Sequence, residues 1–105
     1  YTAKEYEKAI SYLEQVIASG QADMETVFMH GMANMEVSNY PLASGSFTRV
    51  IEHNDNLYLE SACWYLGLCY MMTNDIDKAV KQFSAISASK SRYSKEAAKL
   101  ARRLK

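Results

Sequence analysis

The sequence is short of the residues that most often interrupt helices, because Pro41 is its only proline and four of its 105 residues are glycine. All-β chains need many turns rich in these residues, and disordered chains are usually rich in proline, so both classes are disfavoured. No apolar run approaches the ~20 residues that cross a bilayer, and no secretory signal stands at the start. We therefore expect one all-α domain over residues 1–105, with no membrane insertion by this segment.

An excess of one charge is also lacking, since 12 Lys and Arg balance 12 Asp and Glu. The balance is uneven along the chain: residues 1–57 hold eight acidic and three basic residues, and residues 58–105 hold four acidic and nine basic. A nucleic-acid-binding domain is usually basic as a whole, so no nucleic-acid partner is expected. The basic half is either a solvated last helix or a surface for self-association with the acidic half of a neighbour.

Cysteine is scarce as well. Cys63 and Cys69 lie six residues apart in a predicted helix, which turns by about 600° between them, so the two thiols cannot pair. Unpaired thiols favour a cytoplasmic location, whereas a removed upstream anchor or signal would place the protein outside the cytoplasm. Because the chain opens at Tyr1 without an initiator Met, we expect a fragment of a longer protein and leave the compartment open.

The titratable residues match no pattern of a chemical site. His30, His53, Cys63 and Cys69 form neither Cys-x-x-Cys nor His-x-x-x-His, so no metal is predicted. A Cys–His nucleophile pair would lack an orienting third group, and the isolated glycines form no phosphate-binding loop. We expect no catalytic residues and no cofactor, with His30 hydrogen-bonded between helices and His53 in a surface turn.

One spacing pattern occurs three times along the chain. An aromatic or apolar residue is followed by Ala at +3, a large apolar residue at +7 and a β-branched residue at +10. The copies are Tyr6, Ala9, Leu13 and Val16; Tyr40, Ala43, Phe47 and Val50; and Ile76, Ala79, Phe83 and Ile86. Successive copies lie 34 and 36 residues apart, which is the signature of a repeat protein built from helical pairs.

The spacing within each copy predicts one buried helix face. The alanines are small where a helix must approach its neighbour closely. Gly31 and Gly67 recur at mid-helix positions, where glycine costs about 1 kcal/mol relative to alanine. A cost repeated at equivalent positions indicates that the second helix of each pair presses against the glycine of the first.

Boundary residues agree with this interpretation. Gly20 suits the end of the first helix, Asp23, Asn39 and Asp75 suit N-caps, and Pro41 is tolerated in a first turn. A polar turn is expected at Asn54, Asp55 and Asn56. We predict no strand and about six helices, antiparallel in pairs, at about 2–19, 23–36, 39–53, 57–72, 75–87 and 92–104.

The segment from Trp64 to Tyr70 resembles the first helix of a tetratricopeptide repeat, with that family's Leu-Gly-x-x-Tyr, and Ala79 with Phe83 resembles its Ala-x-x-x-Phe. The middle copy is similar through Gly31, Tyr40, Ala43 and Phe47, and the last helix through Ala97, Leu100, Ala101 and Leu104. The resemblance implies a right-handed superhelix: the second half of one repeat at about 2–19, repeats at 23–53 and 57–88, and a capping helix at 92–104. Related helical repeats, of the half-a-tetratricopeptide or Sel1 type, remain alternatives.

The resemblance also implies that the first helix of each repeat lines a concave groove. The groove positions would be Phe28, Met32, Met35, Trp64, Leu68, Met71 and Met72. The implied function is a non-enzymatic protein–protein interaction scaffold that binds an apolar peptide or helix in this groove. The alternative is a structural or self-association segment, whose groove is filled by its own upstream helices.

Overall fold

The computed structural model describes residues 2–54 and 57–105, which form six α-helices and no strand. The helices are α1 (Ala3–Ala18), α2 (Met24–Glu36), α3 (Tyr40–His53), α4 (Leu59–Met72), α5 (Ile76–Ala88) and α6 (Ser94–Leu104). The all-α prediction is confirmed, and each predicted helix end agrees to within two residues. Asn54 follows α3 as its C-cap, while Asp55 and Asn56 of the predicted turn lie outside the described residues.

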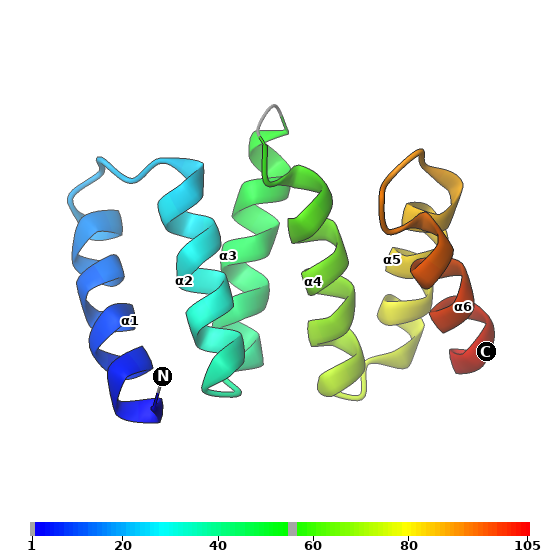
Figure 1. Cartoon of the computed structure of the whole chain (residues 1–105), viewed down its shortest axis with the longest axis horizontal. Coiled ribbons are helices and arrows are strands. Elements are labelled where there is room, and N and C mark those ends of the chain that lie inside the picture. Colours follow the sequence, from blue (N-terminus) through cyan, green and yellow to red (C-terminus); the bar gives the residue numbers. More distant parts are fainter. Residues whose placement is uncertain (1, 55–56) are drawn as a thin grey trace.

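The helices follow one another in a row from α1 to α6, within extents of 39 × 29 × 21 Å. The main contacts join helices that are consecutive in the chain. Figure 1 shows α2 and α4 in front of α3, and α6 in front of α5, so the row has two layers. We call α2, α4 and α6 the first-helix layer. This packing of neighbours is consistent with a helical repeat.

The turns inside the two complete pairs are the same. In α2–α3, Ser38 adopts a left-handed φ of 61°, and the backbone N–H of Asn39 donates to the carbonyl of Asn34 at 2.8 Å. In α4–α5, Asn74 has a φ of 60°, and the N–H of Asp75 donates to the carbonyl of Tyr70 at 2.8 Å. Both are Schellman motifs, which close one helix and start the next within three residues.

The backbone angles at the helix starts explain which of the predicted N-cap side chains make a capping hydrogen bond. Asp23 has an extended backbone, with ψ of 177°, and its carboxylate accepts the backbone N–H of Thr26 at 2.9 Å, as predicted. That hydrogen bond holds the pKa of Asp23 below its ordinary value. Asn39 and Asp75 stand at N-cap positions, but neither side chain caps its helix, so that part of the prediction is wrong. Their ψ angles of 73° and 69°, required by the tight turn, depart from the extended cap conformation.

A phenylalanine ring against a glycine joins the helices of each pair. A Cβ atom at Gly31 would lie 2.7 Å from Cε1 of Phe47, and one at Gly67 would lie 2.6 Å from Cε1 of Phe83. Both rings are fully buried, as are Ala43 and Ala79 one turn earlier. The predicted close approach at the two glycines is confirmed.

The first copy of the pattern, on α1, differs from the other two in the burial of its alanine. Leu13 is buried, but Ala9 is exposed, so the prediction that Ala9 marks a close helix contact is wrong. The reason is that Ala9 borders a cleft: within the described residues, no helix packs over Ala9 as α2 packs over Ala43.

Gly67→Leu should lower the free energy of unfolding by about 1–3 kcal/mol, because the new side chain must displace the buried Phe83 ring. Gly45→Ala is the matched control, since Gly45 is also inside a helix but has no atom within 4 Å of the position that a Cβ would take. Gly45→Ala should raise stability by up to about 1 kcal/mol. Urea unfolding followed by circular dichroism measures both, and equal effects of the two substitutions would contradict the assigned contact.

Candidate protein-binding surface

The seven predicted groove residues lie on α2 and α4. Met72 is 55% exposed, and the other six are half-buried. Phe28, Met32 and Met35 pack against a core shared by α2, α3 and α4. Trp64, Leu68 and Met71 pack against a second core, to which α5 and α6 contribute the buried residues. Most of the set therefore also holds the helices together.

Phe28 and Trp64, the two aromatic residues among the seven, are each covered by a tyrosine ring. Phe28 stacks on Tyr58 with ring centroids 5.1 Å apart, and Trp64 stacks on Tyr93 at 5.2 Å with the ring planes only 7° apart. Tyr58 directly precedes α4, and Tyr93 directly precedes α6. Each first helix is thus joined to the following one through a tyrosine at the start of the latter.

Each stack continues into the contact between phenylalanine and glycine. The ring of Phe28 lies 5.7 Å from that of Phe47, and the ring of Trp64 lies 5.4 Å from that of Phe83. Three rings in succession therefore connect the second helix of a pair, its first helix and the next first helix. Tyr58 and Tyr93 were not predicted from the sequence because both stand outside the helical stripes, although they follow Phe28 and Trp64 at similar intervals of 30 and 29 residues.

A cleft of about 360 Å³ opens between α1 and α2. Of the predicted groove residues, Met32 lines it. Its other lining residues are Glu5, Tyr6, Ala9, Leu13, Met29, Ala33 and Glu36. Met29 is 50% exposed, so large apolar side chains meet solvent here and at Met72. The cleft is apolar with two carboxylates among its lining residues.

His30 is hydrogen-bonded between helices, as the sequence predicted, and its partners lie on two further helices. Its Nδ1 lies 2.6 Å from Ser46 Oγ on α3, and its Nε2 lies 3.2 Å from Glu14 Oε2 on α1. The amide of Asn34 donates to the His30 carbonyl at 2.9 Å. A Ser–His–carboxylate set resembles a nucleophilic triad in composition, but Ser46 is buried inside α3, where backbone N–H groups bond within the helix and cannot serve an oxyanion. The network is suited to holding α1, α2 and α3 in register.

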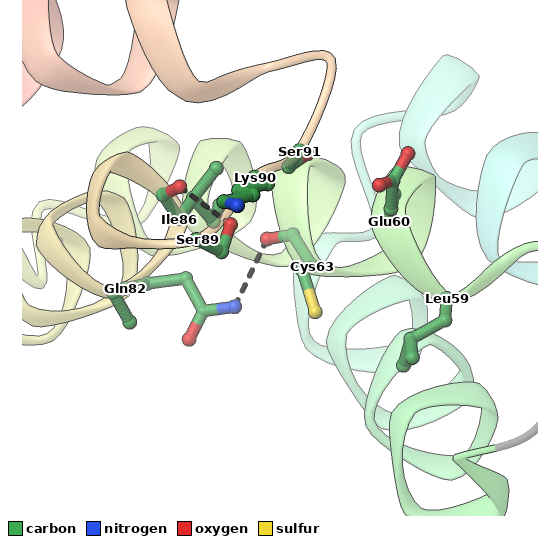
Figure 2. Close-up of a pocket in the computed structure, with 9 residues that line it drawn as sticks. Leu59, Glu60, Cys63, Gln82, Ile86, Ser89, Lys90 and Ser91 are labelled. Atoms are coloured by element: carbon green, nitrogen blue, oxygen red, sulfur yellow. Dashed lines mark hydrogen bonds between the residues drawn. The ribbon is translucent and has the colours of Figure 1, made fainter.

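A second cavity, of about 290 Å³, lies between α4 and the end of α5 (Figure 2). Figure 2 shows Cys63 beside it, with its backbone carbonyl accepting a hydrogen bond from the Gln82 side chain at 3.0 Å. Burial raises the pKa of the Cys63 thiol, and the nearby Glu60 carboxylate adds to the effect. Burial also raises the pKa of Cys69. Both cysteines are unpaired and carry a protonated, weakly nucleophilic thiol at neutral pH.

The described residues offer neither a metal site nor a membrane-spanning helix. Across residues 2–54 and 57–105, no three His, Cys, Asp or Glu side chains come close enough together to hold a metal ion. In that same part of the chain, every helix is too short or too polar to span a bilayer.

No protein-family model matches the chain, and no curated protein is significantly similar to it in sequence.

Ser46→Ala should lower the free energy of unfolding by about 1–3 kcal/mol, because it leaves the buried Nδ1 of His30 without its partner. Ser84→Ala on the exposed face of α5 is the control and should change stability by less than about 0.5 kcal/mol. The measurement is chemical unfolding at pH 7. Equal stability of the two variants would show that the His30 network contributes nothing.

The stack between Trp64 and Tyr93 should appear as a coupling of about 0.5–1.5 kcal/mol in a double-mutant cycle of Trp64→Leu with Tyr93→Leu. The control cycle pairs Trp64→Leu with Tyr12→Leu, because Tyr12 lies on α1 and is 66% exposed. Unfolding free energies of the single and double variants give both couplings. A Trp64–Tyr93 coupling no larger than the control coupling would show that the stack does not stabilise the contact between units.

Proposed function

We propose that this chain is a non-enzymatic protein–protein interaction scaffold of the tetratricopeptide kind, which binds an apolar peptide or helix on its first-helix layer. Two helical pairs with the same turn and the same contact between glycine and phenylalanine support the assignment. In this proposal the pairs stack into a right-handed superhelix that α6 closes. The contact residues are Phe28, Met32, Met35, Trp64, Leu68, Met71 and Met72.

The observation that carries the proposal is the exposure of large apolar side chains on α2 and α4. Met29 and Met72 are 50% and 55% exposed, and Met32 lines the α1–α2 cleft. In this proposal these side chains form the apolar surface that a partner covers, as exposed apolar patches often do. Methionine is flexible and polarisable, so a surface rich in it adapts to the side chains of a partner. In this proposal Phe28 and Trp64 pack against the cores beneath this surface and also contact the partner.

A second candidate function is a structural or self-association segment. The observation that favours it is the stacking of Phe28 and Trp64 on Tyr58 and Tyr93, because these tyrosines belong to the same chain and contact two of the predicted groove residues. Sedimentation equilibrium separates the two functions. A chain that forms a dimer through Met72, and loses the dimer in Met72→Lys, would support self-association.

The test of partner binding uses a displayed library of amphipathic helical peptides, panned against the folded chain. Peptides that bind the wild type should lose at least tenfold in affinity for the double variant Met32→Lys and Met72→Lys, because charges replace the apolar contacts. Leu42→Lys is the matched control, since Leu42 is 47% exposed but lies on α3. The proposal fails if no peptide is enriched, or if Leu42→Lys weakens binding as much as the double variant does.

A further inference from the structure

A groove of about 390 Å³ separates α1 from α3, and buried residues of α2 form its floor. Its apolar lining residues are Ile17 and Ala18 of α1, Val27 of α2, and Pro41, Leu42 and Gly45 of α3. Because two helices of the described row form its walls, the groove lies within the row and is not an end face.

Gly45 lines this groove, and no described residue requires a glycine there. A phenylalanine ring occupies the space beside Gly31 and Gly67, whereas no atom lies within 4 Å of the position that a Cβ of Gly45 would take. The backbone of Gly45 is helical, and glycine inside a helix costs about 1 kcal/mol relative to alanine. The use of glycine that remains is to let the backbone of another element come close.

The face of α3 that carries Gly45 differs from the same face of the other second helices. By the spacing of the repeat, Pro41, Leu42 and Gly45 correspond to Glu7, Lys8 and Ser11 of α1, and to Asp77, Lys78 and Lys81 of α5. All of these residues are exposed. The helices α1 and α5 thus present charged and polar side chains to solvent, whereas α3 presents Leu42, which is 47% exposed, beside bare backbone. The α3 face is therefore suited to contact with another apolar surface.

Opposite charges stand on the two walls of the groove. Arg49 of α3 is exposed and makes no ion pair with another described residue. The side chain of Glu14 on α1 is 51% exposed, although its Oε2 lies 3.2 Å from Nε2 of His30. A partner that satisfies both walls must carry a carboxylate opposite Arg49 and a cation opposite Glu14.

A second copy of the chain carries both charges in the required arrangement. In Figure 1, α1 and α3 run in the same direction. In a dimer whose twofold axis is parallel to these helices, α3 of each copy lies over α1 of the other. Arg49 of each copy then faces the wall that holds Glu14 of the other, and the exposed Leu42 faces the apolar residues of that wall.

We propose that the α1–α3 groove is the interface of a twofold-symmetric dimer of this chain. In this dimer α3 of each copy packs against α1 of the other, Gly45 allows the helices to approach closely, and Arg49 pairs with Glu14 twice. In Figure 1, α3 lies behind α2 and α4, so the interface is on the opposite layer from the partner-binding residues. The proposal does not rest on the proposed function.

Gly45→Leu tests the close approach, because a leucine side chain would fill the groove between the two copies. The substitution preserves the fold, since no atom lies within 4 Å of the new Cβ and leucine favours helices. In sedimentation equilibrium of the full chain, it should raise the dissociation constant of the dimer at least tenfold. Lys81→Leu, which adds the same side chain at the equivalent exposed position of α5, is the matched control and should dimerise like the wild type. Circular dichroism confirms that both variants are folded.

A charge exchange tests whether the occupant is a second copy. Arg49→Glu and Glu14→Arg should each weaken the dimer of the variant with itself at least tenfold, because like charges then meet at both pairs. In an equal mixture of the two variants, one of them labelled with a fluorophore, a mixed dimer should form about as tightly as the wild-type dimer. In that dimer the new glutamate faces the new arginine, and the other pair is the original one.

The proposal is overturned if the wild type stays monomeric up to about 1 mM, which is the range of very weak association. It is also overturned if Gly45→Leu dimerises like Lys81→Leu, or if the mixed variants associate no better than either variant alone. A dimer that persists in Gly45→Leu but is lost in Met72→Lys would place self-association on the first-helix layer instead. Library peptides should bind Gly45→Leu as tightly as the wild type, so the scaffold function is tested separately from this interface.

Discussion

Phe47 and Phe83 each press against a glycine of the preceding helix, and the arrangement of the other elements depends on that contact. A side chain at either glycine would separate the helices and move the buried alanines out of contact. The contact also places Phe28 and Trp64 beside the phenylalanine rings, where Tyr58 and Tyr93 can stack on them. In each pair, one succession of three rings thus joins the two helices to each other and to the next first helix.

This arrangement leaves some large apolar side chains of the first-helix layer exposed to solvent. The aromatic residues Phe28 and Trp64 pack against the two cores, while the methionines at positions 29, 32 and 72 remain accessible or line the cleft. At the α1 end of the described row, the cleft between α1 and α2 is lined by apolar residues with Glu5 and Glu36, and at the α6 end Lys99 and Arg102 are exposed. The two ends of the row therefore differ in charge.

Much of the architecture could be predicted because helical periodicity is a local property. Leu13, Phe47 and Phe83 indicate their buried face through neighbours three and four residues away, and Gly31 and Gly67 stand out because glycine is costly inside a helix. The caps at Asn39 and Asp75 were predicted wrongly because residue type alone does not report ψ, which the left-handed residues Ser38 and Asn74 impose. The groove was harder, since a stripe of large apolar residues looks the same whether a partner or Tyr93 covers it.

The sequence by itself determined that the chain is helical, where its helices begin and end, and that a partner helix presses against Gly31 and Gly67, because each follows from spacing within one turn or one repeat. Which ring meets each glycine was decided by the tertiary structure. Only the tertiary structure decided that Ala9 is exposed while Ala43 and Ala79 are buried, although all three occupy the same position of the pattern. It also decided that Tyr58 and Tyr93 stack on Phe28 and Trp64, two of the predicted groove residues. The physical reason is that burial depends on which helix lies opposite a residue, and a repeat pattern is identical whether or not that neighbour is there.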